Sequence, residues 1–200
     1  MNSKLRYESA ALMLGLANDA VDELVADRTD EVKSLMKNPE NWIRNDYDKF
    51  IESAKSSRYP NYLSSTTAET LRKNGAETFQ LRGFNIGFAL VKDEEGKNII
   101  LVHNNQDDVH NILPDMLAVA KAHGGDRLDH FDGKLSELYE KCGFVEYKRF
   151  KWDNLLAPKG WDYAKFGRPD VILRRLEVKE NTSRRRKRYK LLRKKSQKVS

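Results

Sequence analysis

The sequence has few of the features on which secreted and membrane proteins depend. Cys142 is the only cysteine among 200 residues, so an intramolecular disulfide is excluded and a reducing compartment fits the composition. No apolar run approaches the ~18 residues that a membrane-spanning helix needs. The first residues, Met1 to Arg6, also lack the basic start and apolar stretch of a signal peptide. These absences predict a cytoplasmic protein without a membrane span.

The last twenty residues contain no aspartate and no glutamate. They carry ten of the 37 lysines and arginines, which leaves 27 basic and 30 acidic side chains, a net charge of −3, for residues 1–180. This asymmetry predicts a disordered basic tail that meets a polyanion. The side chains expected to bind nucleic-acid phosphates are Arg184, Arg185, Arg186, Lys187, Arg188, Lys190, Arg193, Lys194 and Lys195.

Other readings of the tail stay open. Tyr189 is placed to stack on a base, yet with Leu191 and Leu192 it could instead form an apolar stripe that meets an anionic membrane surface or an acidic protein. A tail that is merely solvated is a third reading. A basic run carries no sequence specificity, so DNA and RNA are not distinguished.

Apolar residues at helical spacing predominate before Glu77. A stripe of Leu12, Leu16, Ala20 and Leu24 predicts a helix over residues 7–37. Shorter helices are expected over residues 46–56 and 65–73. Residues 1–76 are therefore predicted to be a helical region that packs on the core.

Strands and helices alternate from Glu77 onward. The run Ile99 to Val102 is apolar throughout, which predicts a strand buried on both faces. Strands are expected over 78–81, 86–92, 98–103, 127–131, 145–152 and 170–176, and helices over 112–123 and 134–141. The expected fold is α+β, with a mixed central sheet and helices on both faces. The core spans residues 77–180 and the tail spans 181–200.

The segment Leu138-Tyr139-Glu140-Lys141-Cys142-Gly143-Phe144 resembles the end of the fourth helix in the GNAT (GCN5-related N-acetyltransferase) superfamily. There, such a helix runs into a Gly-Phe turn and then a strand. The element order from Thr78 to Leu176 matches the second to seventh strands of that fold, so the resemblance covers about half the chain. The segments 102–105 and 128–133 also resemble GNAT-like domains carried by bacteriophages, in which case the cytoplasm is that of the host cell.

The resemblance implies transfer of an acetyl group from acetyl-CoA to an amine, largely by proximity. A backbone amide near Asn104 would stabilise the oxyanion, and Tyr139 would protonate the departing thiolate. Glu77 and Asp129 are the candidate bases for the acceptor amine. The residues expected at the cofactor are Val102, Asn104, Asn105 and Asn111.

The chain departs from the family where the CoA pyrophosphate would bind. In place of the family's Arg/Gln-x-x-Gly-x-Gly/Ala pattern stands Gln106-Asp107-Asp108-Val109-His110-Asn111, without glycine, lysine or arginine. Glycines let backbone amides approach phosphate, and adjacent aspartates repel it. Three alternatives follow: CoA binding is lost, other residues hold the phosphates, or the ligand differs. A non-catalytic GNAT-fold protein that binds nucleic acid or a protein partner is therefore the second hypothesis.

Two further features have plain and functional interpretations. The four histidines show no metal-ligand spacing, so no metal site is predicted, although His103 and His130 could act as acid–base groups in a cleft. The long connection over residues 152–170 is rich in aromatic residues. It either lines an acceptor site or forms a structured flap over one edge of the sheet.

Overall fold

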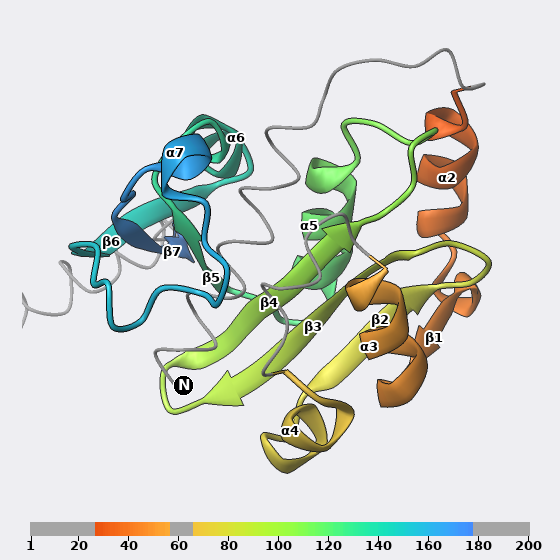
Figure 1. The fold of residues 1–200 in the computed structure, drawn as a ribbon. Coiled ribbons are helices and arrows are strands. Elements are labelled where there is room, and N and C mark those ends of the chain that lie inside the picture. Colours follow the sequence, from red (N-terminus) through yellow and green to blue (C-terminus); the bar gives the residue numbers. More distant parts are fainter. Residues whose placement is uncertain (1–26, 57–65, 178–200) are drawn as a thin grey trace, which may run out of the picture.

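A computed structural model describes residues 27–56 and 66–177 of the chain. A seven-stranded sheet has helices on both of its faces (Figure 1). The elements in chain order are α2 (Thr29–Met36), η1 (Pro39–Asn41), β1 (Trp42–Arg44), α3 (Tyr47–Lys55), α4 (Ala68–Lys73), β2 (Glu77–Leu81), β3 (Ile86–Asp93), β4 (Gly96–Asn104), α5 (Leu113–Ala122), β5 (Arg127–Phe131), α6 (Leu135–Lys141), β6 (Phe144–Phe150), α7 (Tyr163–Phe166) and β7 (Val171–Leu176).

The strands lie in the order β1-β2-β3-β4-β5-β7-β6. All neighbouring pairs are antiparallel except β4 and β5, which run parallel. A parallel pair needs a crossover, and α5 supplies it. The predicted α+β fold with a mixed central sheet and helices on both faces is confirmed, and the predicted strands from residue 78 onward occur in the expected order along the chain.

Three apolar clusters form the core. The largest packs α2, α5 and α6 on one face of the sheet, with Phe79, Phe88 and Leu128 pointing toward those helices. On the other face, α3 and α4 cover Ala89 and Ile100. The third cluster lies on that second face over β5, β6 and β7, where the connection of residues 151–170 packs Trp161 on Phe131, Val171 and Leu173. The connection, called the flap below, is structured, but it covers a face of the sheet and not the edge that was predicted.

Local chemistry explains several helix and turn boundaries. Asp46 begins α3 because its carboxylate accepts a hydrogen bond from the backbone N–H of Lys49. Thr67 caps α4 in the same way through the N–H of Thr70. In the β3–β4 hairpin, Asp93 Oδ1 accepts from the N–H groups of Glu95 and Gly96, and Gly96 takes a φ of 148° that favours glycine.

The N-terminal region differs from its prediction in one respect. Between two predicted helices, Trp42–Arg44 forms β1, which pairs with β2 at the edge of the sheet. A strand of three residues has too little alternation to be detected from a pattern. Of the predicted helix over 7–37, the structure describes only the part from residue 27, where α2 begins at Thr29 and ends at Met36. The remainder lies outside the described residues.

Candidate active site at the parting of β4 and β5

The parallel ladder between β4 and β5 is short. It joins Asn98 to Arg127 and Ile99 to Leu128, although β4 continues to Asn104 and β5 continues to Phe131. The carboxyl ends of the two strands therefore part from each other within the sheet. In sheets with parallel strands, ligands bind where neighbouring strands separate at their carboxyl ends, so this junction is the natural place to look for a site.

A β-bulge in β4 lies beside this junction. The register between β3 and β4 shifts between Gly87 and Ala89, and Leu101 has a φ of 51°, a conformation that is uncommon for a residue with a side chain. The carbonyl oxygen of Leu101 lies 3.0 Å from Nδ1 of His103. The bulge thus orients a histidine on the strand that would carry the oxyanion-stabilising amide.

His103 is fixed as a neutral ring. A carbonyl oxygen can only accept, so Nδ1 carries the proton and Nε2 accepts from the hydroxyl of Ser53 at 2.9 Å. Burial of the ring lowers the pKa of His103 to about 4. Phe50 packs edge-on against the ring, with centroids 5.3 Å apart. His103 is therefore a satisfied core residue, and Ser53 is a partner that the sequence did not point to.

The asparagines that follow β4 hold the next loop in place. Asn104 donates to the carbonyl oxygen of Val109 at 2.7 Å and accepts from the N–H of Gln106. Asn105 donates to the carbonyl oxygen of Ser53 at 2.7 Å. Both side-chain amides thus make backbone contacts that shape the loop between β4 and α5. Val102 is 1% exposed and lies in the core beside α5, so only its backbone is a candidate contact to a ligand.

The loop of residues 105–112 is tied to the start of α2. The N–H of His110 donates to Thr29 Oγ1 at 2.8 Å, and the N–H of Arg28 donates to the carbonyl oxygen of Asp108. The Arg28 guanidinium lies 3.8 Å from the Asp108 carboxylate. One of the two aspartates that oppose phosphate is therefore partly neutralised by a residue eighty positions away in the sequence.

The amino end of α5 follows this loop. Asn111 adopts a φ of 51°, and no side chain caps the helix at Ile112. Pro114 lies in the first turn and has no N–H, while Asp115 adds a negative charge there. At this end of α5, only backbone N–H groups are available to donate hydrogen bonds to an anion. They are fewer than the glycine loop of the family would provide.

Asp129 lies on β5 and faces the α3 side of the junction. Its Oδ1 accepts from Asn98 Nδ2 on β4 at 3.0 Å, and the carboxylate is 2% exposed. This side-chain bond joins Asn98, within the ladder, to the first residue of β5 beyond it. Asp129 is thus the candidate base that the structure places at the parting of the strands.

Tyr139 lies on α6 and is fully buried against β5. Its ring packs on His130 with centroids 4.8 Å apart. Burial, reinforced by the charge of Asp129, raises the pKa of Tyr139, so the phenol stays protonated at neutral pH. Tyr139 and Asp129 are thus both next to β5 but on opposite faces of the sheet, Tyr139 under α6 and Asp129 on the α3 side.

Glu77 lies elsewhere. It begins β2 and forms an ion pair with Lys97 at 2.5 Å, near the carbonyl oxygen of His123 at the carboxyl end of α5. Its hydrogen bond from Lys97 outweighs partial burial and lowers its pKa, which makes the carboxylate a weaker base. Lys97 is at the amino end of β4, opposite to Asn104, so this geometry gives no support to Glu77 as a partner of the other predicted residues.

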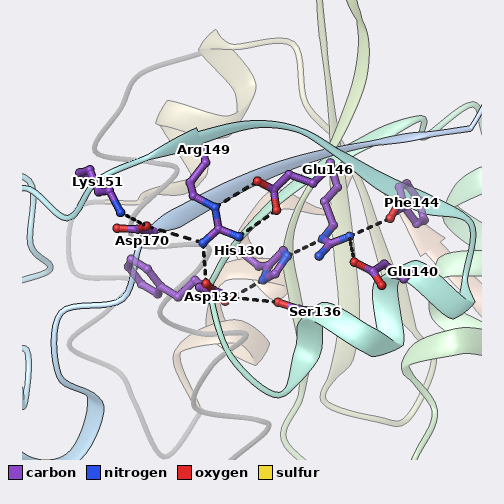
Figure 2. Close-up of polar contacts among 11 residues, drawn as sticks. His130, Asp132, Ser136, Glu140, Phe144, Glu146, Arg149, Lys151 and Asp170 are labelled. Carbon is purple, nitrogen blue, oxygen red and sulfur yellow. Dashed lines mark hydrogen bonds and ion pairs between the residues drawn. The ribbon is translucent and has the colours of Figure 1, made fainter.

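A polar network next to Tyr139 was not predicted (Figure 2). Arg174 on β7 is 1% exposed, and its Nε donates to His130 Nε2 at 2.8 Å. His130 Nδ1 donates in turn to the carbonyl oxygen of Phe131 at 2.7 Å. Burial is the main cause that lowers the pKa of His130 to about 4. The other guanidinium contacts of Arg174 are Glu140 and the carbonyl oxygen of Phe144.

The same network extends to the edge strand through Arg149. This guanidinium binds Glu146, Asp132 and, at 3.6 Å, Asp170, while Lys151 binds Asp170 at 2.9 Å. Figure 2 shows that the contacts join β5, α6, β6 and β7. Apart from the local pair of Glu146 and Arg149, these partners are distant in the chain and share no motif, so the sequence gives no signal for them.

Three other predictions concern metal binding, membrane spans and the basic tail. Within residues 27–56 and 66–177, no group of three or more metal-ligand side chains is arranged to hold an ion. No helix of that part of the chain is long and apolar enough to cross a membrane. The predicted nucleic-acid residues of the tail lie outside the described residues.

Comparison with known proteins finds neither a family model nor a curated protein that matches the sequence. Two solved structures resemble it in part. An acetyltransferase from Bacillus subtilis in complex with CoA is 16% identical, covers 55% of this chain and 83% of its own, and gives a TM-score of 0.37. A GNAT family acetyltransferase from Elizabethkingia anophelis with acetyl-CoA bound is 20% identical, covers 60% and 90%, and also gives 0.37.

Proposed function

We propose that this chain is a divergent GNAT-like N-acyltransferase that transfers an acetyl group from acetyl-CoA to an amine. The observation that carries the proposal is the parting of β4 and β5 after two residue pairs, beside a bulge at Leu101. Beyond Ile99, β4 forms no ladder pair with β5, and this is where the thioester would bind. It also sets Asp129 and Tyr139 on or beside the same strand, β5.

In the proposed reaction, the amine nitrogen attacks the thioester carbonyl and the carbon–sulfur bond breaks. A backbone N–H near Asn104 stabilises the oxyanion. Asp129 takes the proton that the amine loses, directly or through water, and Tyr139 gives a proton to the thiolate. Because Tyr139 is 0% exposed, its role requires that the sulfur reach the inner side of α6, which makes it the step most open to test.

The site suits the thioester end of acetyl-CoA better than it suits the phosphate end. The thioester end meets β4 and Asp129, while the phosphates meet a loop with two aspartates and no glycine. The backbone N–H groups of Leu113 and Asp115 in the first turn of α5, and the guanidinium of Arg28, are the groups that would hold phosphate. Weak donor binding, with a small contribution from the phosphates, is the expected consequence.

Calorimetric titration of the full chain with acetyl-CoA and with CoA, at moderate and at raised salt, tests this function. One-to-one binding that survives raised salt supports the site, because attraction to a basic tail alone is screened. Absence of binding at millimolar ligand leaves the second hypothesis, a non-catalytic GNAT-fold protein with a nucleic-acid or protein partner.

The role of Tyr139 has its own test. Tyr139→Phe removes one hydroxyl and should abolish most acetyl transfer while the protein stays folded. Tyr47→Phe is a matched control, since it removes the same group from a hydroxyl that donates to the carbonyl oxygen of Ala76 at 2.8 Å, far from α6 in the chain. Equal activity of the two variants would contradict the role of Tyr139.

We propose further that the basic tail associates the protein with nucleic acid. The supporting observation is the absence of any acidic residue among the ten basic ones of residues 181–200. Truncation after Glu180 should remove most salt-dependent binding of nucleic acid. Binding that survives truncation unchanged would assign it to another part of the chain.

A further inference from the structure

Aromatic rings and cations alternate along one side of the molecule, at the edge strand β6 and the flap of residues 151–170. Lys148 lies over the ring of Phe150, with its Nζ 4.6 Å from the centroid. Arg168 lies 4.8 Å over Tyr163, and Arg175 lies 5.4 Å over Tyr147. The surface that these six residues form is called the ring–cation surface below.

The register of the sheet places these groups on one face. Lys148 pairs with Leu173 and Phe150 pairs with Val171, and both partners lie in the cluster that the flap covers. Directly paired residues of antiparallel strands project to the same side. Tyr147 packs on the same cluster, and Tyr163 meets it through Trp152, with centroids 6.0 Å apart. Arg149 projects to the opposite face, into the network of Figure 2.

The cations of this surface differ in their partners from the arginines that lie over rings elsewhere in the described residues. Arg28, Arg44 and Arg72 also lie over rings, but each has a carboxylate within 4 Å. Lys148, Arg168 and Arg175 form no ion pair with any carboxylate among the described residues. Of the three flap aspartates, Asp170 pairs with Lys151 and Arg149, while Asp153 and Asp162 accept hydrogen bonds from backbone N–H groups. A cation that lies on a ring keeps its outward N–H groups for an anion.

The rings are also accessible. Phe150 and Tyr163 are each 40% exposed, whereas most aromatic side chains within residues 27–56 and 66–177 are buried. Arg168 donates to Asn154 Oδ1 at 3.4 Å, but this partner is neutral. An exposed ring next to a cation without a carboxylate partner matches the two chemical parts of a nucleotide, because the base stacks and the phosphate binds the charge. Duplexes keep their base faces stacked inside, so such rings can be used only by a single strand.

We propose that the ring–cation surface binds single-stranded nucleic acid, with bases stacked on Phe150 and Tyr163 and phosphates held by Lys148, Arg168 and Arg175. The surface lies on β6 and β7, and β7 is the strand after which the chain leads to the basic tail. The proposal deepens the proposed association with nucleic acid and is independent of acyl transfer. In this proposal, the tail binds nucleic acid electrostatically and without sequence specificity. The folded core supplies the preference for single strands over duplexes.

The test measures binding of the full chain to a fluorescent oligothymidylate of roughly 15 nucleotides, and to a hairpin duplex, over a series of salt concentrations. The double variant Phe150→Ala/Tyr163→Ala should weaken oligothymidylate binding about tenfold or more at every salt concentration, without a change in salt slope. Lys148→Glu/Arg168→Glu should weaken binding and reduce the slope. Lys92→Glu, an exposed charge on β3, is the control and should change much less.

Phe150→Tyr keeps a stacking ring, so it should bind within about twofold of the unaltered protein and shows that the variant surface is folded. The proposal would be supported if the double variant Phe150→Ala/Tyr163→Ala binds oligothymidylate more weakly, both in the full chain and in the chain truncated after Glu180. This result would count even if the tail contributes nothing to binding. Equal affinity of the ring variants and the unaltered protein, or a preference for the duplex, would overturn the proposal. The titration with acetyl-CoA is unaffected by either result, so failure of the acyltransferase proposal remains distinguishable.

Discussion

The two halves of the sheet, on either side of the β4–β5 junction, are held together differently. In the first half, apolar side chains pack on both faces, as where Phe88 stacks on Phe79 with centroids 4.7 Å apart and meets Trp42 at 5.4 Å. In the second half, the face under α6 contains Arg174, a buried charge whose partners come from β5, α6 and the start of β6. The loss of stability on replacing a residue is harder to predict in a core held by hydrogen bonds than in an apolar core.

The largest effect is expected in the first half. Phe88→Ala should lower the free energy of unfolding by about 3–5 kcal/mol, because the side chain is fully buried and leaves a cavity. Urea denaturation of the full chain measures this. Phe150→Ala, at 40% exposure, is the matched control and should cost less than about 1 kcal/mol. Similar losses for both would mean that the β3 core does not dominate stability.

The second half should respond to loss of its buried charge. Arg174→Met keeps most of the volume but leaves His130 Nε2 and the Phe144 carbonyl oxygen without their donor, so we expect a loss of about 2–4 kcal/mol. Arg149→Met removes a guanidinium that is 35% exposed and should cost at most about 1 kcal/mol. An Arg174→Met protein as stable as the original would show that this half is also held by apolar packing.

Each half contains one buried histidine, and both predict acid sensitivity. The pKa values of His103 and His130 fall from 6.5 to about 4 on folding, so the unfolded chain takes up protons first. Their contribution to stability is complete above pH 6.5 and is lost as the pH falls from 6.5 toward 4, by up to about 1.4 kcal/mol per pH unit for each ring.

Denaturation at several pH values, with His103→Gln and His130→Gln, separates the two contributions. Each substitution should flatten part of the slope between pH 6.5 and 4. A slope unchanged by both substitutions would show that carboxylates alone cause the acid sensitivity.

The smallest effect is expected at the tip of the flap. Leu155 is 92% exposed, so Leu155→Ser should change the free energy of unfolding by no more than about 0.5 kcal/mol. Thermal denaturation checks this. A larger loss would indicate that the side chain is covered in solution, for example by a partner or a second copy of the chain.

Sequence patterns located most of the elements because their signals are local. The predicted strand over 127–131 coincides with β5, and the helix over 46–56 coincides with α3 and its two caps. β1 was missed because Trp42–Arg44 is short and becomes a strand only by pairing with β2. Among the site residues, Asp129 and Tyr139 both lie next to β5, on opposite faces of the sheet, while Glu77 lies at the other end of β4.

The sequence by itself determined the alternation of helices and strands, the lack of a phosphate-binding glycine loop and the concentration of positive charge in the tail. These follow from side-chain periodicity, backbone chemistry and composition, which need no knowledge of distant neighbours. Only the tertiary structure decided that β4 and β5 part after two pairs, that Arg28 faces Asp108, and that His130 receives a hydrogen bond from Arg174. Those features depend on which segments pack together, and burial in that packing sets the charge state of each group.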